Sequence, residues 1–213
     1  MEQIAENFKD PRMKYGIMVA LMIIIAHMNI GTKYFYDIPE TLGDSIIDHF
    51  NIREVNVEYS YILSSLASLL GIALSFIIIS YGKTGPAALA IGPTIFATVM
   101  LITVATHFKF YFGFCILRAS FGLYSSIMIM CQLLACSYWF TGMALTFSYG
   151  VIQTVNCFSE AASLWLTGIV YDSTHNVTVT IAIAGVFCFI SAFAAAIYFL
   201  AQGALGTDLS YFK

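Results

Sequence analysis

Charged side chains are scarce in this sequence. Asp, Glu, Lys and Arg together make up 10% of the 213 residues, whereas about a quarter of the residues are charged in soluble proteins. None of these four residue types occurs between Ala119 and Ser159, and 60% of the whole chain is apolar. So long a stretch without a charge is typical of helices that face lipid, and it excludes an ordinary soluble domain.

Three further absences exclude other classes of function. No run of basic residues occurs and the formal net charge is −3, so we expect no nucleic-acid partner. The cysteines lack the spacing of zinc ligands, and no His lies near Cys131 and Cys136, so we expect neither a metal nor a cofactor. A Gly-x-Ser-x-Gly element is absent, and none of the four His joins a Ser or Asp constellation, so we expect no enzyme.

Six apolar stretches are long enough to cross a hydrocarbon layer of about 30 Å. Charged residues, glycines and prolines separate them, as they do between helices. The stretches occupy residues 14–36, 58–81, 86–106, 109–137, 142–171 and 177–202. We therefore predict an all-α integral membrane protein with a six-helix transmembrane bundle at 14–202. Tails flank the bundle at 1–13 and 203–213, and a 3+3 inverted repeat is compatible with this layout.

The distribution of lysines and arginines predicts the orientation of the bundle. On one side lie Lys9, Arg12, Lys14, Lys83 and Lys213, and on the other lie Lys33, Arg53 and Lys109. We therefore expect both tails to be cytoplasmic and the loop 37–57 to lie outside or in a lumen. Apolar residues at 42, 46, 47, 50 and 52 predict a short amphipathic helix on that face. The glycosylation sequon Asn176-Val177-Thr178 lies on the same side.

Several short elements match one superfamily of transporters. The elements are Gly31, Tyr34-Phe35-Tyr36-Asp37-Ile38-Pro39, Arg118 with Phe121-Gly122, Gln132, Trp139-Phe140 with Gly142, and Gly150. With its six spans and cytoplasmic ends, the chain resembles the N-terminal half of a major facilitator superfamily transporter. More narrowly, it is similar to the lysosomal dipeptide-transporter branch of that superfamily.

The resemblance implies a function and a set of partners. The chain would move a small organic solute, peptide or amino-acid-like, by alternating access, as one half or a truncated form of a carrier. Its partners would be the lipid bilayer, the solute and a second six-helix half from the same or another chain. Its membrane would be lysosomal or vacuolar, or the plasma membrane. A non-transporting bundle that binds or regulates another membrane protein is the alternative function.

The same resemblance gives roles to particular residues. Tyr36, Asp37 and Pro39 would mark the outer end of the first helix, and Gly82 and Lys83 would belong to the cytoplasmic gate loop. The sequence also departs from the family pattern. The two charged positions that hold the ends of a dipeptide in that branch correspond to Ser126 and Cys157, which carry no charge.

Two ions lie inside the predicted spans, Arg118 and Glu160. An ionised side chain at mid-bilayer costs about 2.5–3.5 kcal/mol on insertion scales, so such a residue usually faces a partner or a polar cavity. At about 1.5 Å per residue, the two lie at similar depth on consecutive helices, which makes an ion pair between them one hypothesis. Three roles stay open: a structural clamp, a solute or proton site with Glu160 titrating and Arg118 binding an anion, or unrelated positions.

Three uncharged or neutral polar residues complete the candidate solute or proton site: His27, Asn29 and Gln132. His27 is either a proton relay or a satisfied or cavity-wetted histidine. Because His27 and Asn29 are two residues apart, they point to different faces of one helix, and at most one should line a cavity. Hydrogen bonding between helices explains Gln132, which also matches the family pattern.

Overall fold

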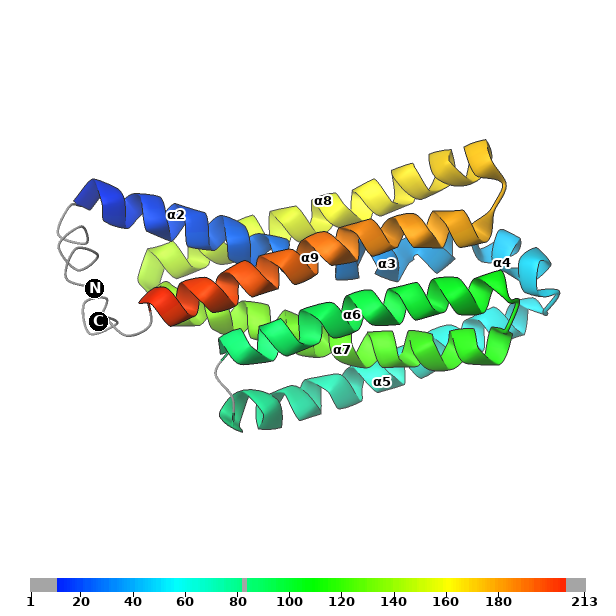
Figure 1. Cartoon of the computed structure of the whole chain (residues 1–213), viewed down its shortest axis with the longest axis horizontal. Helices are drawn as coiled ribbons and strands as arrows, with labels where there is room; N and C mark the ends of the chain where they lie inside the picture. The colour runs from blue at the N-terminus through cyan, green and yellow to red at the C-terminus, as the bar shows by residue number, and fades with distance from the viewer. Residues whose placement is uncertain (1–10, 82–83, 206–213) are drawn as a thin grey trace.

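The protein is described here by a computed structural model that covers residues 11–81 and 84–205, and these residues form helices with no strand among them (Figure 1). The helices are α2 (Pro11–His27), α3 (Ile30–Thr41), α4 (Gly43–Phe50), α5 (Glu54–Tyr81), α6 (Thr84–His107), α7 (Tyr111–Trp139), α8 (Gly142–Thr174) and α9 (Val177–Leu205). The predicted all-α fold is confirmed for this part of the chain. The residues predicted as the far ends of the two tails lie outside it.

Five segments among the described residues are long and apolar enough to cross a membrane. They are Tyr15–Thr41, Glu54–Ile78, Thr84–His107, Tyr111–Trp139 and Val177–Leu205. A sixth helix, α8, forms where the last-but-one span was predicted, but it falls short in apolar character. It carries Glu160 and Asp172 together with amides such as Gln153 and Asn156. Its helical state is confirmed, and its crossing of a membrane stays a prediction.

The helices pack in a pattern that is symmetric between the two halves of the chain. Helix α6 packs on α9 and α7, α5 packs on α7, and α3 packs on α8 and α9. Exchanging the first span (α2–α3) with α7, α5 with α8, and α6 with α9 reproduces this set of pairs. Consecutive spans run in opposite directions along the bundle (Figure 1). Two three-helix repeats of opposite direction would pack in this way.

Glycines mark the closest approaches between helix backbones. A Cβ added to Gly31 of α3 would overlap the backbone of Cys188 in α9, and one added to Gly71 of α5 would overlap the carbonyl of Leu123 in α7. Small residues allow this contact, because association of helices in lipid depends on close packing rather than on the hydrophobic effect. These two contacts join the first span to the last and the second to the fourth.

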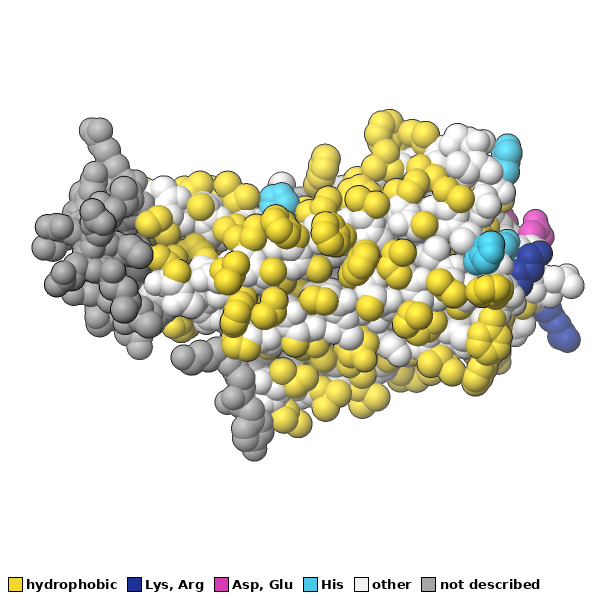
Figure 2. Space-filling view, in the orientation of Figure 1, with side chains coloured by type: hydrophobic (Ala, Val, Ile, Leu, Met, Phe, Trp, Pro, Cys, Tyr) yellow, Lys and Arg dark blue, Asp and Glu magenta, His cyan; other side chains and the backbone are white. Residues whose placement is uncertain are grey.

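The two ends of the bundle are formed by different elements. Helix α2 begins and α9 ends at one end, while α4 lies at the opposite end (Figure 1). Figure 2 shows a surface dominated by hydrophobic side chains, with the coloured charged side chains gathered at the α4 end. The predicted amphipathic helix is confirmed as α4, in which Ile46 is buried and Ile47 and Phe50 pack against the core.

The loop predicted at 37–57 is largely helical instead. Helix α3 continues to Thr41, so Asp37 and Pro39 lie within a helix rather than in a connection. Pro39 has no N–H to donate to the carbonyl four residues before it, and α3 ends two residues later at Thr41. The expected boundary at the end of the first span was therefore placed about one turn too early.

Candidate functional site

The first span is broken in its middle. Helix α2 ends at His27, a turn follows at Met28 and Asn29, and α3 begins at Ile30. The predicted span at 14–36 corresponds to the apolar segment Tyr15–Thr41, and this turn interrupts its helix. Asn29, a residue common in turns, stands at the interruption. A break inside an apolar bundle needs other groups to satisfy the backbone atoms that the helix no longer pairs.

Gln132 of α7 supplies two of these partners. Its Nε2 donates to the carbonyl of Ile25 at 2.8 Å and to that of Ala26 at 3.2 Å. Its Oε1 accepts a hydrogen bond from Asn29 Nδ2 at 2.6 Å. Both side chains are buried. Gln132 therefore bonds between helices, as expected, and Asn29 is enclosed by the bundle instead of lining an open cavity.

Serines of α8 and α9 satisfy further backbone groups around the break. Ser191 Oγ accepts the N–H of Gly31 at 2.7 Å and lies 3.4 Å from the carbonyl oxygen of His27, to which it donates. These two groups would bond each other in an unbroken helix. Ser159 donates to the carbonyl of Ile30 at 2.7 Å, and Ser163 donates to that of Tyr34 at 2.6 Å. Three neighbouring helices thus hold the broken span in place.

We expect Gln132→Leu to destabilise the protein by about 1–3 kcal/mol, because it removes the side-chain partner of the Ala26 carbonyl and of Asn29 Nδ2 and leaves the Ile25 carbonyl with only the Met28 N–H at 3.2 Å. The matched control is Gln153→Leu on α8, since Gln153 is exposed and bonds only within its own helix, to Cys157 Sγ at 3.4 Å. Thermal unfolding of the detergent-solubilised chain measures both. Equal melting temperatures for the two variants would contradict the bridging role of Gln132.

Glu160 forms an ion pair, but not with Arg118. Its Oε1 lies 2.7 Å from Lys33 Nζ, and the two side chains retain 37% and 30% exposure, respectively. The pair joins α8 to α3. The hypothesis of an Arg118–Glu160 pair was therefore wrong, because similar depth in two helices does not fix the direction in which each side chain points.

Arg118 lies instead between α7 and α5. Only 3% of its surface is exposed, and its guanidinium carbon lies 4.2 Å from the centre of the Tyr61 ring. The Nε and Nη1 atoms have no hydrogen-bond partner among the described residues. A desolvated cation over an aromatic ring gains about 2 kcal/mol, whereas an ion removed from water costs several kcal/mol. Arg118 is thus a buried cation with unfilled donors.

Asp37 extends the ion pair along α3. It stands one turn after Lys33, so the two side chains share a helix face, and the charges of Glu160, Glu40 and Lys33 all act on it. We call Lys33, Asp37 and Glu160 the charged cluster. Its members are all partly exposed. An accessible group of ions inside an otherwise apolar bundle is able to exchange partners with a solute.

The remaining predicted site residues lie in different settings. Tyr36 is exposed, and Pro39 is buried. His27 Nδ1 bonds the carbonyl of Ile23 at 2.7 Å, within its own helix, so Nδ1 carries the proton and only Nε2 is left to exchange one. The gate-loop residues Gly82 and Lys83 lie outside the described residues. Within the described residues, no group of three or more His, Cys, Asp or Glu is placed to hold a metal ion.

Sequence reasoning missed Lys33 and Tyr61. Lys33 was counted only as a marker of orientation at the end of a span, and Tyr61 was not considered. One signal was available for Lys33: its spacing of four residues from Asp37 predicts that the two share a helix face. No pattern in the sequence connects Tyr61 with Arg118.

Comparison with known proteins assigns no family, because no protein-family model matches the chain and no curated protein is significantly similar to it. The arrangement of the residues described above is therefore the basis for inferring a function.

Proposed function

We propose that this chain is an integral membrane protein that forms one six-helix half of a major-facilitator-type carrier and moves a small organic solute by alternating access. Five apolar segments of sufficient length support the membrane assignment. The exchange symmetry of the helix contacts and the motifs around Tyr36 and Gln132 support the carrier type. The broken first span is a further support, since interrupted helices recur at the binding sites of transporters.

The observation that carries the proposal is the partly exposed charged cluster. Ions within membrane spans are costly and mark solute or ion pathways. A purely structural ion pair would be enclosed, yet about a third of the Lys33 and Glu160 side chains remains accessible at 30% and 37%. Solvent access lets a solute compete for either member of the pair.

In the proposed cycle the solute replaces one partner of each ion. An amino group of the solute binds the carboxylate of Glu160 or Asp37, and an acidic group binds Lys33 or the unfilled donors of Arg118. When the solute leaves, the Lys33–Glu160 pair re-forms and again offsets the cost of the two charges. A second six-helix half, from the same or another chain, closes the site on its open side.

The orientation and location of the protein are part of the same proposal. We place both termini in the cytoplasm, in agreement with the common end at which α2 begins and α9 ends (Figure 1). The α4 end then faces the outside or the lumen. The membrane is lysosomal or vacuolar, or the plasma membrane.

One observation favours a second candidate, a non-transporting bundle that binds or regulates another membrane protein. The Lys33–Glu160 pair is already satisfied within the chain at 2.7 Å, as a clamp between α3 and α8 would be. The two candidates differ in what happens when the carboxylate is neutralised without a change of shape.

Glu160→Gln is the variant that tests the proposal. We expect uptake into proteoliposomes to fall at least about tenfold, since a charged hydrogen bond contributes about 1.5–3 kcal/mol. The assay uses the full chain, an imposed pH gradient and a panel of labelled amino acids, dipeptides and organic acids. Glu58→Gln is the control, because Glu58 is exposed on α5 and belongs to no described ion pair.

The outcomes separate the two candidates. Lost uptake with an unchanged melting temperature supports transport chemistry at Glu160. A large loss of stability in Glu160→Gln, but not in Glu58→Gln, supports the structural clamp. Uptake by Glu160→Gln at the rate of the unaltered protein contradicts the carrier proposal. No uptake of any solute by the unaltered protein contradicts a carrier formed by this chain alone or with a second copy of itself.

A further inference from the structure

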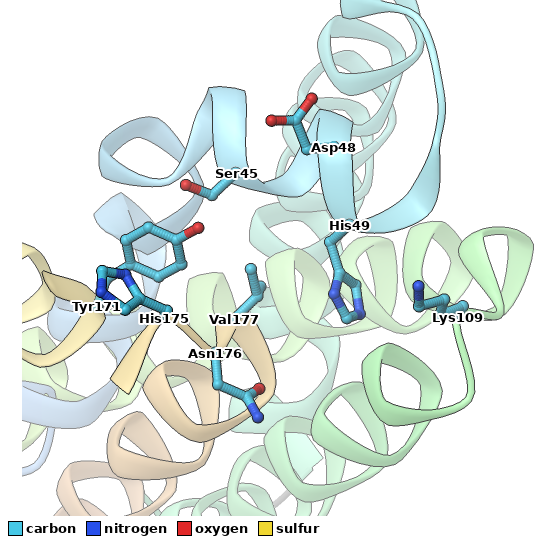
Figure 3. A pocket seen from close by; sticks show the side chains of 8 residues that line it. All are labelled: Ser45, Asp48, His49, Lys109, Tyr171, His175, Asn176 and Val177. Atoms are coloured by element: carbon cyan, nitrogen blue, oxygen red, sulfur yellow. The ribbon is translucent and has the colours of Figure 1, made fainter. Parts of the chain in front are cut away.

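A polar pocket opens at the α4 end of the bundle and contains none of the residues of the charged cluster (Figure 3). Its volume is about 390 Å³, within the range of roughly 300–1,000 Å³ typical of small-molecule sites. Five parts of the chain line it, including the first residue of α9, Val177. Asp48 and His49 come from α4, Lys109 from the α6–α7 turn, Tyr171 from α8, and His175 and Asn176 from the α8–α9 connection.

The hydrogen bonds of Asn176 fix which of its atoms is free. Its Oδ1 accepts the N–H groups of Thr178 at 2.9 Å and of Val179 at 3.4 Å, so it caps the start of α9. The Nδ2 group, which only donates, is left for a ligand. The N-terminus of α9 adds a partial positive charge at the same place.

His49 is oriented in a similar way. Its Nε2 lies 2.9 Å from the carbonyl oxygen of Thr106, and since a carbonyl only accepts, Nε2 carries a proton. The second nitrogen, Nδ1, takes no part in this bond. The other imidazole, that of His175, lies edge-on to the ring of Tyr171, with 6.3 Å between the ring centres. Both rings are therefore held by protein contacts rather than by each other.

The lining contains one lysine, Lys109, and one acid, Asp48. Lys109 is exposed, forms no ion pair among the described residues and sits at the rim with a positive φ of 53°. In Figure 3 the carboxylate of Asp48 points away from Lys109, whereas the hydroxyl of Tyr171 points into the space between the two sides. The groups around the centre of the pocket are thus mainly donors.

We propose that this pocket binds an oxyanion, a phosphate or carboxylate group, held by Lys109, the Asn176 amide and the hydroxyl of Tyr171. The shared chemistry fits either a small soluble anion or the headgroup of an anionic phospholipid, because the pocket lies at the end of the bundle. The site goes beyond the proposed transport function and does not depend on it.

The first arm of the test measures thermal unfolding of the full chain, produced without N-glycosylation, in sodium phosphate and in sodium chloride of equal ionic strength. We expect phosphate to raise the melting temperature, since a ligand that binds only the folded state stabilises it. Lys109→Met should weaken the apparent affinity at least tenfold. Arg53→Met is the control, because it removes an exposed cation near the same end without touching the pocket.

Asn176→Asp is the sharper variant. Aspartate caps a helix as well as asparagine does, so α9 should keep its start, but a carboxylate oxygen replaces the Nδ2 donor. We expect phosphate stabilisation to disappear while the melting temperature in chloride is unchanged. A glycan attached to Asn176 would modify the same nitrogen and should abolish binding in the same way.

The second arm places the chain in nanodiscs of phosphatidylcholine with or without phosphatidylglycerol. Stabilisation by phosphatidylglycerol alone, lost in Lys109→Met, identifies a lipid headgroup as the ligand; stabilisation by free phosphate identifies a soluble anion. The proposal is overturned if neither anion stabilises the protein, if Arg53→Met loses as much as Lys109→Met, or if Asn176→Asp binds phosphate as the unaltered chain does. Each of these results leaves the uptake test of Glu160 unaffected.

Discussion

Replacing Gly31 by alanine should prevent the bundle from reaching its folded state. The added Cβ would overlap the backbone of Cys188 and Phe187 in α9, and a backbone cannot turn aside as a side chain can. Moving α3 away from α9 would also break the 2.7 Å bond from the Gly31 N–H to Ser191 Oγ, which satisfies the break in the first span. Overpacking typically costs about 1–3 kcal/mol, occasionally more, and we expect a value at or above the upper end.

The matched control is Gly150→Ala in α8, where an added Cβ meets no atom within 4 Å. Alanine is favoured over glycine in a helix by about 1 kcal/mol, so this variant should be as stable as the unaltered chain or more stable. The yield of monodisperse protein and the melting temperature in detergent report both effects. Equal behaviour of the two variants would show that α3 and α9 do not approach as closely as described.

The helices themselves were predictable from the sequence because long apolar stretches separated by charged residues, glycine and proline indicate them directly. The interval 177–202 corresponds to α9 at Val177–Leu205, and 86–106 corresponds to α6 at Thr84–His107. The amphipathic pattern around Ile46 likewise predicted α4. In each case the signal lies within one short segment, so no knowledge of distant parts of the chain is needed.

The break at Met28 and Asn29 was not predictable in the same way. Its backbone groups are satisfied by Gln132 and Ser191, which stand more than one hundred residues later in the sequence. Asn29 is a turn-forming residue, but the side chains that satisfy the freed backbone groups lie on other helices. Both side chains are recognisable in the sequence as polar residues within apolar stretches, but the sequence does not show which backbone groups they bond.

In the candidate site too, the ionic residues are recognisable within single segments, whereas their partners depend on how distant segments pack. Arg118 and Glu160 stand out in the sequence because ions are rare within apolar stretches. Counting residues along each helix gives depth alone, and the rotation of each helix about its axis decides whether two ions meet. That rotation directs Glu160 towards Lys33 and Arg118 towards Tyr61. Lys33 was missed because a cation at the end of a span has an ordinary explanation as a marker of orientation.

Arg118→Met should abolish uptake while leaving the fold intact or more stable. The guanidinium is 3% exposed, with two nitrogen atoms unpaired and only the Tyr61 ring as a described partner for its charge. Replacing buried charges by apolar side chains of similar volume is often neutral or stabilising by about 1–4 kcal/mol. Methionine is also flexible enough to fill the space that the arginine leaves. Arg118 therefore lowers stability, and the proposed transport function accounts for its presence.

The size of the effect on uptake follows from the bond that is lost. A hydrogen bond to a charged group contributes about 1.5–3 kcal/mol, which corresponds to a loss of tenfold to more than a hundredfold in uptake of a solute with an acidic group. Arg118→Lys keeps the charge but not the planar set of donors, so it should recover only part of the uptake.

Tyr61→Leu tests the ring separately, and it should lower stability because the buried cation then has no described partner left. If Arg118→Met instead unfolds the protein, Arg118 is a clamp between α7 and α5, and the non-transporting bundle becomes the better account of the chain.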